Sequence, residues 1–168
     1  MISPTLDFFS ILETLCKYKV DFIIVGGVCG VLHGAPVTTF DLDIVHSRSQ
    51  ENLLRLLAAL QELDAYYRGR QDQELKPDLA HLSSPGHQLL MTRFGPLDLL
   101  GTIGTGHGYT ELRPHSDEIK IGSLQLRVLS LEKLIEVKEE TGFEKDKAIL
   151  PLLRQTLLER RKEREQKS

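Results

Sequence analysis

Val25-Gly26-Gly27, followed after thirteen residues by Asp41-Leu42-Asp43-Ile44, is the stretch of sequence that decides the fold. Residues 21–25 are β-branched and aromatic and end in two glycines, which predicts a buried strand. Residues 27–34 carry spaced apolar side chains and stop at a glycine, which predicts a short helix. Residues 38–45 are again rich in β-branched side chains and predict a second strand. The stretch therefore predicts a strand, a glycine turn, a helix and an acidic strand.

The two aspartates of the acidic strand carry the chemistry. On a strand, Asp41 and Asp43 would point to the same face, about 7 Å apart along the chain. Like charges side by side repel each other, and a divalent cation resolves the repulsion. Mg²⁺ suits such a site because it binds one or two carboxylates together with substrate phosphates. The turn at Gly26 and Gly27 lets backbone amides approach an anion such as phosphate. The plainer alternative is an acidic edge strand in solvent, which the apolar neighbours Leu42 and Ile44 disfavour.

A third carboxylate lies further along the chain. Asp98 is the one acid in the apolar run Phe94 to Leu100, where a charged residue needs an explanation. On a strand next to Asp41 and Asp43 it would complete a trio. Three carboxylates could hold two Mg²⁺ ions, which clamp the attacking and leaving oxygens of an in-line phosphoryl transfer.

The rest of the chain completes an alternation of strands and helices. Between residues 64 and 86 the polar and turn-forming sequence predicts loop and partial helix. The fold class is therefore α/β or α+β, a mixed sheet flanked by helices, with helices at the C-terminal end. The remaining predicted helices are residues 4–18 with a Ser3-Pro4 cap, a helix from Ser47 or Ser49 to Leu63, Ser130 to Thr141, and one from Glu144 onward; the remaining strands are 87–94 and 97–100 across a Gly95-Pro96 turn, and 118–121 and 124–128.

Composition limits the class of protein. The 168 residues are 40% hydrophobic, and 24 acidic against 21 basic residues give a formal net charge of −3. This excludes a disordered chain and a strongly basic nucleic-acid coat. We expect one catalytic domain over residues 1–158 and a charged tail over 159–168. With no membrane-span-length apolar run, no signal peptide and only two cysteines, we expect a cytoplasmic protein without membrane contact.

The ordered set of residues resembles the nucleotidyltransferase superfamily, whose fold is shared by DNA polymerase beta. The shared pattern is a hydrophobic residue with Gly-Gly, then a gap, then Asp-hydrophobic-Asp-hydrophobic, here residues 25–27 and 41–44, with Asp98 downstream. The resemblance implies a Mg²⁺-dependent transfer of a nucleoside monophosphate from a nucleoside triphosphate. It implies two metal ions held by Asp41, Asp43 and Asp98, with Mn²⁺ as the alternative ion.

Further details resemble the branch that holds the AbiEii-type nucleotidyltransferase toxins. That resemblance implies nucleotide contacts by the motif residue Thr39, by Lys138 on a late helix, and by Asp146 in a basic-residue-plus-Asp step. Lys138 would neutralise charge on the phosphates, and Asp146 would orient it. Two basic residues common in the family are replaced here, by Val37 and by Phe143.

The sequence leaves the acceptor open. A toxin-like protein would modify RNA or tRNA and have an antitoxin partner, whereas a drug-modifying enzyme would use a small hydroxylated molecule. A catalytically silent domain that binds nucleotide or protein is the third alternative, and a homodimer is an open possibility. The glycine-rich residues 101–108 predict a mobile loop beside the site, suited to substrate gating.

Overall fold

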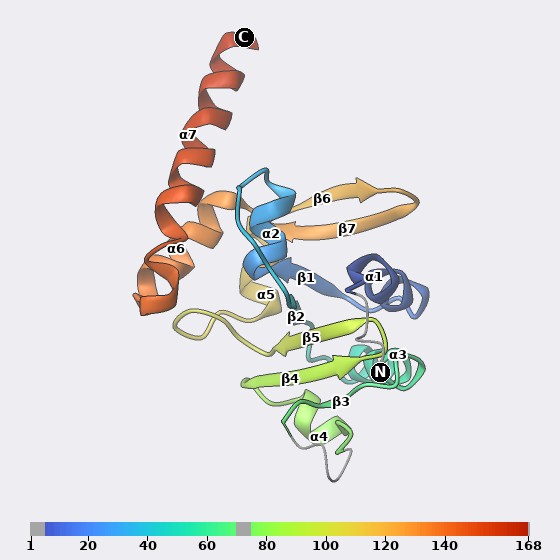
Figure 1. The fold of residues 1–168 in the computed structure, drawn as a ribbon. Helices are drawn as coiled ribbons and strands as arrows, with labels where there is room; N and C mark the ends of the chain where they lie inside the picture. The colour runs from blue at the N-terminus through green and yellow to red at the C-terminus, as the bar shows by residue number, and fades with distance from the viewer. Residues whose placement is uncertain (1–5, 70–74, 168) are drawn as a thin grey trace.

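The computed structural model describes residues 6–69 and 75–167. Within them the strands form one seven-stranded sheet in the order β3-β4-β5-β2-β1-β7-β6 (Figure 1). The pairs β2–β5 and β1–β7 are parallel, and the other pairs are antiparallel. The predicted mixed sheet is therefore confirmed. The strands are β1 (Phe22–Val25), β2 (Leu42–His46), β3 (Tyr66–Tyr67), β4 (His87–Thr92), β5 (Gly95–Leu100), β6 (Ser116–Ile121) and β7 (Leu124–Leu129).

Helices flank this sheet, and their side-chain caps explain where the longer ones begin. Asp7, Ser49 and Ser130 each accept a hydrogen bond from a backbone N–H three residues further on. The described helices are α1 (Phe8–Lys17), α2 (Gly26–Leu32), α3 (Gln50–Glu62), α4 (Leu79–Leu82), α5 (Tyr109–Leu112), α6 (Leu131–Thr141) and α7 (Leu150–Lys167), with short 3₁₀ turns at Arg113–His115 and Glu144–Asp146.

Four predicted boundaries differ from the structure. Helix α1 begins at Phe8 because Asp7 caps it, and the expected Ser3-Pro4 cap lies outside the described residues. The turn between β4 and β5 falls on residues 93–94, and Gly95 and Pro96 open β5 instead. Thr92 favours this turn because its hydroxyl donates to the Gly95 carbonyl at 2.8 Å and accepts from the Phe94 N–H at 3.1 Å.

The acidic strand also begins later than expected, at Leu42 rather than at residue 38. Thr39 explains the delay, because its hydroxyl donates to the Asp41 carbonyl at 3.0 Å and holds the chain in a bend. Asp41 therefore lies on that bend, one residue before β2 and not on the strand as expected, and its shared face with Asp43 stays a prediction.

At the C-terminal end the helix expected from Glu144 is interrupted. Residues 144–146 form a 3₁₀ turn, and α7 starts only at Leu150. It then continues through the charged residues to Lys167 and projects away from the sheet (Figure 1). No helix in the described ranges combines the length and apolar character that a membrane crossing requires.

The sheet separates an apolar face from the acidic one. Leu42, Ile44, Leu97 and Leu99 are fully buried at alternate positions of β2 and β5. Because side chains alternate across a strand, the residues between them point to the opposite face. That opposite face carries Asp43 and Asp98.

Candidate active site

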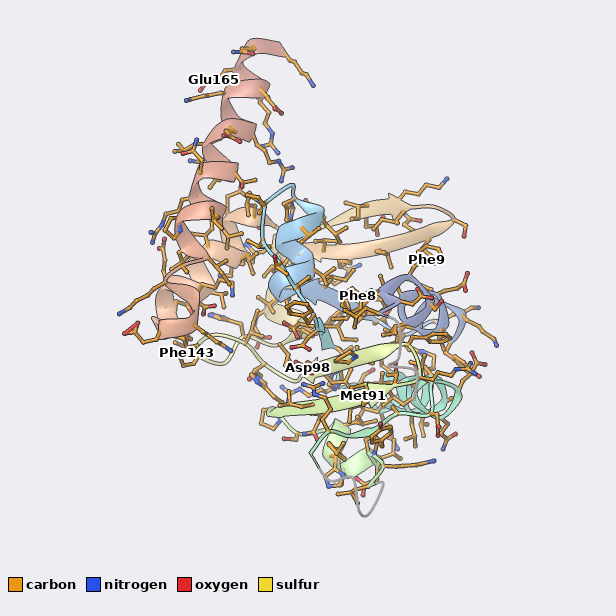
Figure 2. The ribbon with its side chains drawn as sticks, in the orientation of Figure 1. Phe8, Phe9, Met91, Asp98, Phe143 and Glu165 are labelled. Carbon is orange, nitrogen blue, oxygen red and sulfur yellow. The ribbon has the colours of Figure 1, made fainter. Side chains whose placement is uncertain are left out.

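Asp43 and Asp98 are direct neighbours in the sheet. They are paired in register on the parallel strands β2 and β5, and on its other side Asp43 pairs with Val25 of β1. Figure 2 labels Asp98 on β5. Adjacent strands are about 4.8 Å apart, so the two carboxyl groups lie on one face within hydrogen-bonding reach. The structure thus brings together two of the three acids predicted from the sequence.

The environment of Asp43 raises the pKa of its carboxyl group. Burial, followed by the neighbouring charge and hydrogen bond of Asp98 and then the charge of Asp41, raises the pKa of Asp43 to about 7. The positive charge of Lys138 acts in the opposite direction. Asp98 is itself buried, at 8% exposure. Two acids in so little water are stable only when a proton or a cation lies between them.

The glycines of the motif have a packing role. Gly26 adopts a left-handed φ of +68°, and a Cβ there would overlap Asp43 Oδ2 and lie 2.9 Å from its Cγ. A Cβ on Gly27 would lie 2.7 Å from Thr39 Oγ1. Both glycines therefore let the start of α2 approach the acidic strand and the bend before it.

Asp41 lies close to the pair without joining it. It is half-buried on the bend, and its charge contributes to the raised pKa of Asp43. Across residues 6–69 and 75–167, no three His, Cys, Asp or Glu side chains form a group that could hold a metal ion. The role of Asp41 as a metal ligand stays a prediction.

Arg68 is a site residue that sequence reasoning missed. Its Nη1 lies 2.7 Å from Asp98 Oδ1 and donates to the Leu90 carbonyl at 2.6 Å. The contact with Asp98 meets the distance criterion for an ion pair, but its geometry is not that of a hydrogen bond. Asp98 Oδ1 is buried and accepts no hydrogen bond from the described residues. The aromatic pair Tyr66-Tyr67 before it favours a strand and was the available signal. That strand, β3, adds Arg68 to the acidic face.

Lys138 and Asp146 form a buried ion pair. Lys138 Nζ donates to Asp146 Oδ1 at 2.9 Å, and Asp146 is only 5% exposed. The pair joins α6 to the 3₁₀ turn that follows it. The two late residues that the resemblance singled out are therefore a linked pair rather than solvated surface charges.

One cavity of about 130 Å³ joins Asp43 to the Lys138–Asp146 pair, and its lining includes neither Asp41 nor Asp98. Its lining includes Gly26, Asp43, Lys138 and Asp146, so four of the predicted site residues face the same space. Gly27 lines a smaller hollow beside it, together with Gly26 and Lys138.

The glycine-rich loop forms one side of this cavity and is held against α6. Glu140 on α6 bonds to His107 Nε2 at 2.9 Å and accepts from Thr105 Oγ1 at 3.2 Å. Gly104, in a left-handed conformation, packs against Val137 and Glu140 of α6. The structure shows the loop hydrogen-bonded to α6. That the loop controls substrate entry stays a prediction.

The donor set fits a hard divalent cation. Asp43 and Asp98 offer carboxylate oxygens side by side, and one of the Asp98 oxygens, Oδ1, already has the Arg68 guanidinium as its partner. Mg²⁺ usually takes one or two protein carboxylates and completes its shell with water and phosphate oxygens. The fit therefore rests on a pair of acids, with Asp41 close by.

The fold is the one found in nucleotidyltransferases. No protein-family model and no curated protein matches the sequence, whereas solved structures match over most of the chain. A Thermotoga maritima protein, provisionally assigned as a nucleotidyltransferase, aligns with a TM-score of 0.55 and 19% identity over 90% of this chain and 91% of its own.

Two further similar structures are of proteins connected with antibiotics. The lincosamide antibiotic adenylyltransferase LnuA, solved with lincomycin bound, has a TM-score of 0.59 at 15% identity over 90% of this chain and 98% of its own. The resistance factor ANT(2'')-Ia has a TM-score of 0.55 at 16% identity over 89% and 82%. The fold expected from the sequence is confirmed, and membership of the superfamily and of its AbiEii-type branch stays a prediction.

Proposed function

We propose that this chain is a nucleotidyltransferase that moves a nucleoside monophosphate from a nucleoside triphosphate, such as ATP, to a hydroxyl group of a small molecule. The observation that carries the proposal is the Asp43–Asp98 pair, of which Asp43 lines a cavity together with Lys138. A domain with no cation or phosphate to bind has no physical reason to keep a buried acid, Asp98, beside the half-buried acid Asp43.

In this proposal Asp43 and Asp98 hold Mg²⁺, with Asp41 as a further ligand and Mn²⁺ as the alternative ion. The bound metal would supply charge neutralisation of the phosphates and a template for in-line attack. Gly26 and Gly27 would offer backbone N–H groups to the triphosphate beside the acidic strand, with Thr39 supporting the bend. Lys138, oriented by Asp146, offsets the charge that develops on the leaving group.

The reaction forms one bond and breaks one. The acceptor oxygen bonds to the α-phosphorus, the bond from that phosphorus to the oxygen bridging to the β-phosphate breaks, and pyrophosphate leaves. A carboxylate oxygen of Asp98 takes the acceptor proton, and the ion pair with Arg68 keeps that carboxyl oriented.

The structural neighbours favour a small-molecule acceptor over RNA. LnuA was solved with lincomycin bound, and nearly its whole length aligns with this chain. The described elements belong to one sheet and its flanking helices, and none forms a separate module for gripping a large RNA.

The test is transfer of label from α-³²P nucleoside triphosphates in the presence of Mg²⁺. The acceptors are lincomycin, a panel of polyhydroxylated small molecules, and total RNA with tRNA. We expect pyrophosphate release and label in a small molecule with the wild type, and neither with Asp43→Asn. Label in RNA instead would move the acceptor to the toxin-like class, for which an antitoxin and a homodimer would then be sought. No release with any triphosphate or acceptor would leave the silent-domain alternative.

A further inference from the structure

Phe143 is a large apolar side chain that the proposed chemistry does not use. It is 55% exposed, yet it lines the same cavity as Asp43 and Lys138. Single exposed hydrophobic residues are ordinary on protein surfaces. Phe143 differs from them because its cavity also holds one of the two paired acids.

The structure fixes where this ring lies. Gly142 ends α6 in a left-handed conformation, with φ of 58°, and its N–H donates to the Lys138 carbonyl at 3.1 Å. The Phe143 carbonyl accepts from the Asp146 N–H at 3.0 Å, and the Asp146 side chain is tied to Lys138. The ring is thus carried on a short turn that the buried ion pair anchors. Figure 2 shows it at the turn between α6 and α7.

The surroundings of the ring combine apolar and cationic groups. The cavity lining includes the aliphatic side chains of Leu100, Ile103 and Val137. Lys145 lines it as well, and its Nζ lies 5.7 Å from the centroid of the Phe143 ring. The cavity therefore offers a flat aromatic surface and positive charge together, which suits a planar ring joined to an anion.

We infer that Phe143 is the platform on which the base of the bound nucleoside triphosphate stacks. The inference rests on the proposed function and extends it to the base. The phosphates lie toward Gly26, Asp43 and Lys138, and the base lies toward the α6–α7 turn. The phenyl ring offers a flat stacking area at this position.

Stacking on a phenyl ring makes little distinction between bases, because every base has a π-face. Phe143 would therefore supply affinity for nucleoside triphosphates as a class. Its removal should weaken ATP and GTP to a similar extent, on the order of tenfold. Inorganic tripolyphosphate has no base, so its binding should be unchanged.

The test is titration calorimetry of ATP, GTP and tripolyphosphate, each with Mg²⁺, on the wild type and Phe143→Ala. Phe9→Ala is the matched control, because Phe9 is also an exposed phenylalanine, at 41%, and lies on α1 away from the turn (Figure 2). We expect weaker ATP and GTP binding with Phe143→Ala alone. A second variant, Phe143→Trp, introduces the single tryptophan of the chain, and its fluorescence should be quenched by ATP and not by tripolyphosphate.

The outcomes separate this inference from the proposed function. If Phe143→Ala binds ATP as tightly as the wild type, the inference about the base platform is overturned and the proposed function still stands. Equal loss of ATP and tripolyphosphate in Phe143→Ala also overturns it, since the residue would then act only through the structure of the turn. Failure of the wild type to bind either probe would overturn both.

Discussion

Asp43 and Asp98 lie side by side on the parallel strands β2 and β5, and their carboxyl groups face the same side of the sheet. Repulsion between them makes the site a source of instability when no cation is bound. This relationship links the stability of the protein to its proposed chemistry and underlies the first two predictions.

Replacing Asp43 with asparagine removes one of the two charges and keeps the shape of the side chain. At pH 8 without divalent metal, we expect Asp43→Asn to raise the free energy of unfolding by about 1 kcal/mol or more, because a carboxylate with a raised pKa is costly to ionise. Urea denaturation with a chelator measures this change. Asp117→Asn, on the exposed part of β6, is the control and should change stability by less than about 0.5 kcal/mol. Destabilisation by Asp43→Asn would contradict the repulsion.

The pH dependence of stability should carry the signature of Asp43. Its pKa is raised from 3.8 to about 7 in the folded chain, so between these values the folded state binds a proton that the unfolded state has released. The stabilisation is complete below pH 4 and is lost as the pH rises through about 7. The measurement is the difference between wild-type and Asp43→Asn unfolding free energies at several pH values, which should widen from pH 4 to pH 8. Parallel curves would show that Asp43 has an ordinary pKa.

Arg68 should matter more than an arginine in a surface ion pair. Its side chain is 26% exposed and compensates the buried Asp98, so Arg68→Gln should cost about 2 kcal/mol and reduce transfer by misplacing that carboxyl. Arg55→Gln is the control, because Arg55 pairs with the exposed Asp21 at 3.5 Å and should lose less than about 1 kcal/mol. In a double-mutant cycle, Arg68→Gln should have little further effect on stability in the Asp98→Asn background. Strict additivity would argue against the ion pair.

Breaking the pair between Lys138 and Asp146 should destabilise the turn that follows α6. Asp146→Asn leaves Lys138 without its buried partner, and we expect a loss of about 3 kcal/mol together with weaker nucleotide binding. Glu144→Gln is a control on the same turn, because Glu144 pairs with Lys147 on the exposed surface and should cost under about 1 kcal/mol. Equal effects of the two variants on thermal unfolding would contradict the buried pair.

The latch formed by Glu140 should control exchange in the glycine-rich loop. His107 N–H and Gly106 N–H both donate to the Ile103 carbonyl within this loop. Glu140→Ala removes the bonds to His107 and Thr105, so hydrogen exchange at residues 103–107 should accelerate. Glu139→Ala, which breaks only the surface pair with Arg154, should leave the exchange of these amides unchanged. Unchanged exchange in Glu140→Ala would mean that backbone bonds alone hold the loop.

Local patterns were enough to predict most of the elements and the fold. The β-branched run before Gly26 and the apolar residues on either side of Asp43 predict that β1 and β2 are buried strands. A capping residue such as Ser130 predicts where a helix begins. The failures occurred where one side chain redirects the backbone. The bond from Thr39 to the Asp41 carbonyl and the cap by Asp7 depend on geometry that propensity does not specify.

The sequence predicted which types of residue form the site, but it predicted few of the contacts between them. Sequence spacing placed Asp43 and Asp98 on strands, whereas their adjacency depends on the parallel pairing of β2 with β5, which are separated by α3, β3, α4 and β4 in the chain. Arg68 was missed for the same reason, since the two-residue strand β3 is defined by its pairing with β4. Long-range pairing of this kind leaves little local signal.

The most direct test of the central claim is titration calorimetry of Mg²⁺ with a non-hydrolysable ATP analogue, on the wild type, Asp43→Asn and Asp98→Asn. Our account predicts that the analogue binds the wild type only when Mg²⁺ is present, and that either substitution abolishes this metal-dependent binding. Absence of binding to the wild type, or binding that both substitutions leave unchanged, would contradict it.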